Sequence, residues 1–383
     1  MRFPEFSGEW EKCKVSDLLD FYSTNSLSWE QLEYDTNAMM NLHYGLIHVG
    51  LPTMVDLAKD KLPNIKENNM PKNFELCKEG DVAFADASED TNEVAKTVEF
   101  FNLAGKNVVC GLHTIHGRDN KHKTVVGFKG YAFSSAAFHN QIRRIAQGTK
   151  IYSISTKNFF ECYIGLPSKP EQSKIATLLR LIDERIATQN KIIEDLKKLK
   201  SAITDLLFHS IADAHTIRLG EIAHITNGAG DVQDANTEHQ EDWYPFFDRS
   251  EELKWFPTYS FDKEAVIYAG EGQSFYPRYY NGKFALHQRC YAITDFASCI
   301  IPKYCYHFMN TLNSYFVRNS VGSTVPSLRM DIFQKVEIRL PPIPKQQHIC
   351  KIIDAFYTKL EVEQRGISIL QELKQFLLSQ MFI

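Results

Sequence analysis

The sequence lacks the apolar segments that would direct or anchor a protein in a membrane. Its first residues, MRFPEFSGEWEKCK, contain no apolar stretch that could act as a signal peptide. No run approaches the roughly 20 apolar residues that are needed to cross a bilayer. The 383 residues, 44% of them hydrophobic and 23% charged, are typical of a soluble protein of two or three domains. We therefore expect a cytoplasmic protein with no membrane partner.

Close cysteine pairs and catalytic signatures are also missing. The eight cysteines include no CxxC pair, so we interpret them as reduced thiols that fill core or surface positions, and we predict no metal site. There is no GxxxxGK[ST] loop, HExxH, GxSxG or Asn/Asp-Pro-Pro-aromatic motif, and Gly228-Ala-Gly230 lacks the third glycine of a dinucleotide-binding loop. These absences favour a binding subunit over an enzyme, and we predict no catalytic residue.

The sequence does contain a duplication. The segment LPSKPEQSKIATLLRLIDERI at 166–186 matches LPPIPKQQHICKIIDAFYTKL at 340–360, with an offset of 174 residues. The register starts at the lead-ins Gly148…Ser153 and Gly322…Ser327 and continues without a gap for about 60 residues. Chance would not keep register over this length, so we interpret the two segments as copies.

Weaker copies precede the strong ones. VSDL at 15–18 resembles LGEI at 219–222, and AGK at 104–106 resembles NGK at 281–283. The chain therefore alternates between globular and helical regions. We predict an α+β fold with two globular domains at 1–166 and 214–340, a central helix at 167–213 and a C-terminal helix at 341–383.

Both helical regions have apolar residues at alternating steps of four and three, which is the pattern of a coiled-coil seam. Gln189 and Glu363 interrupt the pattern at equivalent places, as do Lys200 and Lys374. Polar residues in a seam can determine its register. The alternative is that each helix packs only on its own globular domain. The predicted seam residues are Ile175, Leu179, Ile182, Ile186, Ile193, Leu196, Ile349, Ile353, Phe356, Leu360, Ile367 and Leu370.

Charge is distributed unevenly within each globular region. Residues 1–99 carry 9 Lys+Arg and 19 Asp+Glu, whereas residues 100–166 carry 9 and 2. Residues 214–272 carry 4 and 12, whereas residues 273–340 carry 8 and 3. A basic surface can attract a polyanion although the net charge is −4. An ordinary fluctuation of composition is the alternative explanation.

The basic parts contain side chains that are suited to DNA. They include HTIHGRDNKHK at 113–123 and FYPRYYNGKFALHQR at 275–289. Arg can bind guanine and Gln can bind adenine through paired hydrogen bonds, while Lys more often contacts phosphate. Each of these side chains could equally be a solvated or structural residue. The candidate DNA-binding residues are His113, Arg118, Lys121, Lys123, Arg278, Tyr279, Lys283, His287, Gln288 and Arg289.

On these residues the chain resembles the specificity subunit of a type I restriction–modification system. The resemblance is carried by the two LP…P…Q-helix segments, by their Gly…Ser lead-ins and by GKFALHQR at 282–289. It implies two target-recognition domains related by an internal pseudo-two-fold repeat. Each would bind one half of a bipartite, asymmetric DNA site in the major groove. The two long antiparallel coiled-coil helices between them would act as a ruler.

The resemblance also implies which partners to expect. They are double-stranded DNA, two modification subunits that methylate adenine with S-adenosylmethionine, and two restriction subunits that use ATP and Mg²⁺. The chain itself would then carry no cofactor and perform no chemistry. An alternative is a non-catalytic coiled-coil scaffold that does not bind DNA. A third possibility, a nuclease or methyltransferase in its own right, needs a catalytic constellation that the sequence does not display.

Overall fold

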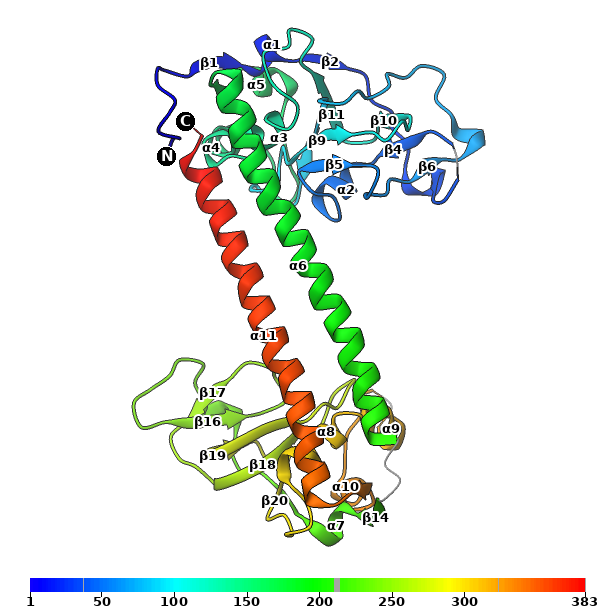
Figure 1. Ribbon diagram of the computed structural model, residues 1–383, viewed down its shortest axis with the longest axis vertical. Helices are drawn as coiled ribbons and strands as arrows, with labels where there is room; N and C mark the ends of the chain where they lie inside the picture. Colours follow the sequence, from blue (N-terminus) through cyan, green and yellow to red (C-terminus); the bar gives the residue numbers. More distant parts are fainter. Residues whose placement is uncertain (37, 210–213, 323, 383) are drawn as a thin grey trace. The chain divides into compact units, whose positions relative to one another are not determined.

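The computed structural model describes residues 1–36, 38–209, 214–322 and 324–382. They form two compact units, and each is described by itself: unit 1 contains Met1–Lys191 and Arg365–Ile383, and unit 2 contains Ile192–Gln364. Two long helices, α6 (Lys169–His209) and α11 (Ile343–Gln380), each contribute one part to either unit (Figure 1). Residues 210–213 and 383 of the expected helical segments lie outside the described residues, and the domain boundaries stay a prediction.

Unit 1 is built on a five-stranded sheet in the order β2-β11-β7-β9-β5. The β5–β9 pair is parallel and the other three pairs are antiparallel. The strands are β2 (Asp20–Tyr22), β11 (Thr114–Arg118), β7 (Val82–Ala85), β9 (Thr97–Asn102) and β5 (Met54–Asp56). A second sheet contains β10 (Val108–Cys110), β4 (Met40–Leu42), β6 (Asn64–Ile65) and β3 (Leu32–Glu33).

Short elements complete unit 1. Two antiparallel ladders pair β1 (Glu11–Lys14) with β13 (Tyr163–Leu166), and β8 (Ala87–Ser88) with β12 (Tyr152–Ser153). The short helices are α1 (Val15–Leu18), α2 (Tyr44–His48), α3 (Lys129–Phe133), α4 (Ala136–Ile145) and α5 (Thr156–Phe160), with 3-10 turns at Trp29–Gln31 and Glu67–Asn69.

Unit 2 is built on a six-stranded sheet in the order β15-β20-β18-β19-β16-β17. The strands are β15 (His224–Asn227), β20 (Cys290–Thr294), β18 (Phe261–Ala269), β19 (Arg278–Leu286), β16 (Tyr244–Phe247) and β17 (Lys254–Phe256). A ladder pairs β14 (His215–Arg218) with β21 (Glu337–Leu340). The short helices are α7 (Leu219–Ile222), α8 (Pro302–Met309), α9 (Asn313–Asn319) and α10 (Met330–Gln334), with a 3-10 turn at Val232–Asp234.

The two units repeat one topology. The order β2-β11-β7-β9-β5 in unit 1 corresponds to β15-β20-β18-β19-β16 in unit 2, and every corresponding pair of strands has the same relative direction. The VSDL and LGEI segments are the corresponding helical turns α1 and α7. The AGK–NGK correspondence is wrong, because NGK lies inside β19 whereas AGK follows the end of β9. The α+β fold and its internal repeat are confirmed.

The duplicated Gly…Ser lead-ins form the same small hairpin in both units. Gln147 and Ser153 exchange two backbone hydrogen bonds of 2.9 Å, and Val321 and Ser327 exchange bonds of 2.9 and 2.8 Å. Gly148 and Gly322 have φ values of +146° and +102°. A Cβ atom at Gly148 would lie 1.9 Å from the carbonyl oxygen of Ile151, so glycine is required there.

Within each unit, the two helix parts run in opposite directions. In unit 1, Lys374 of α11 forms a 2.6 Å ion pair with Asp183 of α6, and Met381, just beyond α11, belongs to the same core as Ile175 near the start of α6. Under the repeat, Lys200 corresponds to Lys374 and Tyr357 corresponds to Asp183. In unit 2 the Lys200 Nζ atom lies 4.1 Å from the ring centre of Tyr357. Each predicted seam residue is buried or half-buried. No helix in the described ranges is long and apolar enough to cross a membrane.

A buried glutamine fixes the start of α6 to the globular part of unit 1. Gln172 is 1% exposed and lies in the first turn of the helix. Its Oε1 accepts a hydrogen bond from the backbone N–H of Val125 at 3.0 Å. Its Nε2 donates to the carbonyl oxygens of Lys123 at 3.2 Å and Pro167 at 2.9 Å. One side chain therefore joins the helix to two other segments.

Gln346 makes the equivalent three bonds at the start of α11. Its Oε1 accepts from the N–H of Ile301 at 2.9 Å, and its Nε2 donates to the carbonyl oxygens of Cys299 at 2.8 Å and Pro341 at 2.9 Å. The side chain is fully buried. These bonds give a physical reason for the glutamine in both copies of the duplicated segment.

We predict that Gln346→Ala lowers the free energy of unfolding by about 1–3 kcal/mol, because it leaves buried backbone groups without hydrogen-bond partners. The free energy of unfolding, measured by urea titration with circular dichroism, checks this. The matched control is Gln347→Ala, whose side chain is exposed in the same helical turn and should change stability by less than about 0.5 kcal/mol. Equal effects of the two substitutions would contradict the proposed joint.

Candidate nucleic-acid interface

An exposed histidine–carboxylate pair lies at one end of the unit 1 sheet. Asp86 directly follows β7 and His113 directly precedes β11, and the antiparallel pairing of these strands brings the two residues together. The His113 Nδ1 atom lies 3.1 Å from Asp86 Oδ1, and the histidine side chain is 50% exposed. His113 has a φ of +53°, in the left-handed region.

The corresponding place in unit 2 carries an arginine–carboxylate pair. Arg289 directly precedes β20, and Glu271 follows β18. Arg289 Nη1 lies 2.8 Å from Glu271 Oε1, and the arginine side chain is 65% exposed. The two units therefore present different side chains from equivalent positions of one topology.

The duplicated hairpins border these two sheet ends. In unit 1, Ser153 pairs with Ala87, the residue that follows Asp86. In unit 2, Ser327 forms a β-bridge with Glu271 itself. The duplicated hairpins thus lie beside the carboxylates, while the side chains that face the carboxylates differ between the units.

The turn that carries Arg289 is held by a close backbone approach. Gln288 N–H donates to the carbonyl oxygen of Gly230 at 3.1 Å, and Gly230 N–H donates to Leu286 at 3.0 Å. A Cβ atom at Gly228 would lie 2.0 Å from the Leu286 carbonyl oxygen. The two glycines of the Gly228-Ala-Gly230 segment therefore serve this packing. His287 closes the turn, since its Nδ1 accepts from the N–H of Arg289 at 3.2 Å.

Three candidates from the basic part of unit 1 have partners within the protein. Lys121 is exposed, but its Nζ donates to the Asp17 carbonyl oxygen at 2.8 Å. The half-buried Lys123 donates to Glu11 at 2.8 Å. Arg118 is 7% exposed, and all its guanidinium nitrogens donate to groups of the protein. These bonds, above all those to Asp81, raise the pKa of Arg118.

The remaining candidates of unit 2 differ in exposure. Arg278 and Tyr279 are half-buried: Arg278 donates to the Ser250 carbonyl oxygen, and the Tyr279 hydroxyl donates to Glu264. Burial and the bond to Glu264 raise the pKa of the Tyr279 phenol. Lys283 is exposed on β19, and its Nζ lies 4.7 Å from the Tyr259 ring centre. Gln288 is exposed beside Arg289, whereas His287 is half-buried.

The acidic and basic parts of the chain neutralise each other to a considerable degree. Arg118 pairs with Asp81 and Glu75, and Lys129 pairs with Glu99. The three carboxylates belong to the acidic part of the region, at residues 1–99. Burial alone would raise the pKa of Asp81, but hydrogen bonds from His116 and Arg118 outweigh it, so this pKa lies below its usual range. Some of the unevenly distributed charges of the sequence therefore form ion pairs inside unit 1 and do not contribute to a basic surface.

The sequence interpretation missed both carboxylates of the sheet ends. Asp86 lies in a strongly acidic stretch and Glu271 stands alone, so neither is conspicuous. Their positions follow from strand pairing, which single-sequence patterns do not give. In the topological repeat Asp86 corresponds to Gly270 and Glu271 to Ala87, so the two carboxylates occupy neighbouring and not identical positions.

Comparison with known proteins assigns the family. A protein-family model, described as the type I restriction modification DNA specificity domain, matches residues 60–198 and residues 212–375. Together the two matches cover more than half of the chain. The chain belongs to this family.

A known specificity subunit is similar in sequence to part of this chain. The type I restriction enzyme EcoDI specificity subunit of Escherichia coli is 31% identical over 165 residues, which cover 43% of this chain and 36% of that protein. The matched segment is thus about a third of that relative's length.

Solved structures share the fold. The S subunit of a type I restriction–modification system from M. genitalium superimposes with a TM-score of 0.64 at 17% identity, over 100% of this chain and 99% of that one. A chain from a structure concerning complex assembly and conformational transition of the type I R-M system gives 0.60 at 15% identity, over 98% and 97%.

We predict that Gly228→Ala destabilises this specificity-family chain by about 1–3 kcal/mol, because the new methyl group would overlap the Leu286 carbonyl. Urea unfolding of the purified chain measures the effect. The control is Gly366→Ala in α11, where nothing lies within 4 Å of the added Cβ. That substitution should be neutral or stabilise by up to about 1 kcal/mol. A neutral Gly228→Ala would contradict the close approach.

Proposed function

We propose that the chain is the DNA-recognition subunit of a type I restriction–modification enzyme. The observation that carries the proposal is the family match, which occurs once in each half of the sequence. In this proposal, each globular region binds one half of a bipartite site in the major groove. The equivalent sheet ends support it, because His113 in one unit and Arg289 in the other would recognise different bases. The site should therefore be asymmetric.

The exposed carboxylate partners do not prevent such contacts. The Arg289–Glu271 pair is largely exposed on the arginine side, and exposed ion pairs typically contribute about 0–1 kcal/mol. A bidentate contact to guanine contributes about 1–3 kcal/mol of discrimination, so it can replace the internal pair. Until DNA binds, the carboxylate keeps the side chain oriented. Gln288 beside Arg289 is available for adenine.

Two copies of a modification subunit would bind the duplicated helices. Leu199 on α6 and Leu373 on α11 are equivalent under the repeat and are 50% and 42% exposed. Ile369 and Phe376 extend the apolar surface beside Leu373. Exposed apolar residues on helices are suited to protein partners, and the duplicated leucine suits two identical ones, whereas the equivalents of Ile369 and Phe376 are Asp195 and Ala202. Adenine methylation with S-adenosylmethionine, and ATP- and Mg²⁺-dependent restriction, would then belong to the partner subunits.

Deleting the gene should remove one gapped, asymmetric N6-methyladenine motif from the genome. Sequencing that detects this base, with and without the gene, measures it. A complemented strain is the control and should regain the motif. A methylation pattern that is unchanged in a strain with active modification subunits would refute the proposal and favour a coiled-coil scaffold without a DNA role.

We expect Arg289→Ala to weaken binding of the motif by about 10–100-fold, the equivalent of one lost bidentate base contact. Only the half-site bound by unit 2 should lose base preference, whereas His113→Ala should affect only the other half-site. The assembled complex and duplexes with single substitutions provide the measurement. The matched control, Arg318→Ala, removes an exposed arginine of α9 in the same unit and should preserve base preference. Preference retained in Arg289→Ala would exclude this sheet end as the interface.

A further inference from the structure

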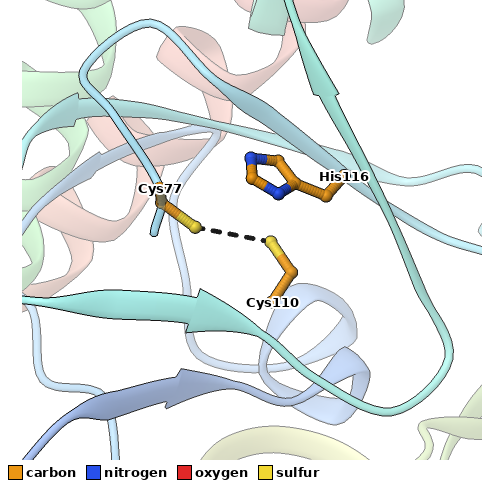
Figure 2. Close-up of side chains that lie close together, drawn as sticks. All are labelled: Cys77, Cys110 and His116. Atoms are coloured by element: carbon orange, nitrogen blue, oxygen red, sulfur yellow. Dashed lines mark hydrogen bonds between the residues drawn. The ribbon is translucent and has the colours of Figure 1, made fainter. Parts of the chain in front are cut away.

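Three buried side chains of unit 1 bring metal-binding atoms together. Cys77 precedes β7, Cys110 ends β10 and His116 lies in β11 (Figure 2). The two Sγ atoms are 3.6 Å apart, and one ligand atom from each residue lies within 4.8 Å of the others. Cys77 is 5% exposed, Cys110 2% and His116 0%. The cluster is thus closed to solvent.

The histidine is oriented as a metal ligand would be. Its Nε2 lies 2.7 Å from Asp81 Oδ2, which assigns the ring proton to this nitrogen. The Nδ1 atom is then left with a free electron pair, and it has no hydrogen-bond partner although it is buried. Figure 2 shows one ring nitrogen on the side of the two sulfur atoms. A carboxylate that holds the far nitrogen of a ligating histidine is a recurring feature of metal sites.

Charge balance in this region is compatible with a dication. Arg118 neutralises Asp81 through a bidentate pair of 2.8 Å bonds. Two thiolates and one divalent ion would likewise sum to zero, with a neutral imidazole as third ligand. A closed apolar region tolerates such a neutral group far better than an unpaired charge.

The fold itself does not require polar residues at these positions. Gly117 pairs with Val82 in unit 1, and the corresponding residues Ile293 and Val266 pair in unit 2. By this register, the equivalents of Asp81, His116 and Arg118 are Ala265, Ala292 and Thr294. The two alanines are fully buried. One unit thus forms the same sheet with small residues, so the sheet alone does not require Asp81, His116 and Arg118 in unit 1.

We propose that Cys77, Cys110 and His116 bind a zinc ion. Thiolate and imidazole ligands select zinc over the oxygen-binding Mg²⁺ and Ca²⁺. Two thiolates at about 2.3 Å from a tetrahedral zinc lie about 3.8 Å apart, close to the observed sulfur separation. The described residues provide three of the four ligands of a tetrahedral zinc. Binding releases the two thiol protons.

The ion would tie the Cys110–His116 segment to Cys77, which lies 33 residues before Cys110 in the sequence. Cys110 and His116 flank the connection that ends at His113, and Cys77 belongs to the segment that leads into β7. Zinc would therefore stabilise the sheet end of unit 1. The metal proposal replaces our expectation of thiols that only fill space. It does not rest on the DNA role, since metal content is measured without DNA.

The test is the metal content of the full chain, purified under reducing conditions and reconstituted with Zn²⁺. We expect one zinc per chain by mass spectrometry, and X-ray absorption should report two sulfur ligands and one imidazole nitrogen. Substoichiometric zinc after reconstitution of the reduced, folded protein would overturn the proposal. A Cys77–Cys110 disulfide in protein isolated with alkylation of free thiols would also overturn it.

Substitutions of single ligands distinguish loss of metal binding from a general loss of folding. Cys110→Ser and His116→Ala should each lose most of the zinc, and His116→Ala introduces the residue that unit 2 has at this position. The control Cys290→Ser changes a similarly buried thiol in unit 2, and it should retain the metal. Because a variant can fail to fold, cobalt substitution of the unmodified chain is a second measurement. A thiolate-to-cobalt charge-transfer band supports the site, and its absence contradicts it.

Discussion

The joint made by Gln172 and Gln346 is the constraint on which the rest of this structure depends. Each glutamine amide bonds only to backbone groups, two on its own globular region and one at the entry to its helix. Backbone atoms are present whatever the side chains are, so the joined segments can change in sequence while the joint stays intact. The segments around Lys123 and Cys299 do differ. A recognition protein benefits from such a joint, since its binding surfaces must diverge on a fixed frame.

At the sheet ends, too, the backbone structure is the same in both units while the exposed side chains differ. The hairpins at 147–153 and 321–327 have the same hydrogen bonds, and each lies beside a carboxylate. What faces the carboxylate is a histidine in one unit and an arginine in the other. The two units thus share a backbone frame and differ in the side chain that they present.

Much of the fold was predictable because its signals are local. The duplication, the long helices and the VSDL–LGEI turns depend on spacing along a short stretch of chain. The candidate site was less predictable, because a side chain's role depends on partners that strand pairing brings in. Arg118 looked like a base-contacting residue, yet Asp81, 37 residues away, holds it inside. The Cys77–Cys110–His116 cluster was invisible for the same reason: its members meet only once β10 and β11 are formed.

The division of α11 between the units also bears on how the protein is made. Leu377, Leu378, Met381 and Phe382 belong to the same core as Val15 and Leu18, so residues that follow unit 2 in the sequence complete unit 1. At about 5–20 residues per second, unit 1 waits roughly ten seconds or more with part of its core exposed, while unit 2 is translated. The core of unit 1 therefore cannot be completed until unit 2 has been translated.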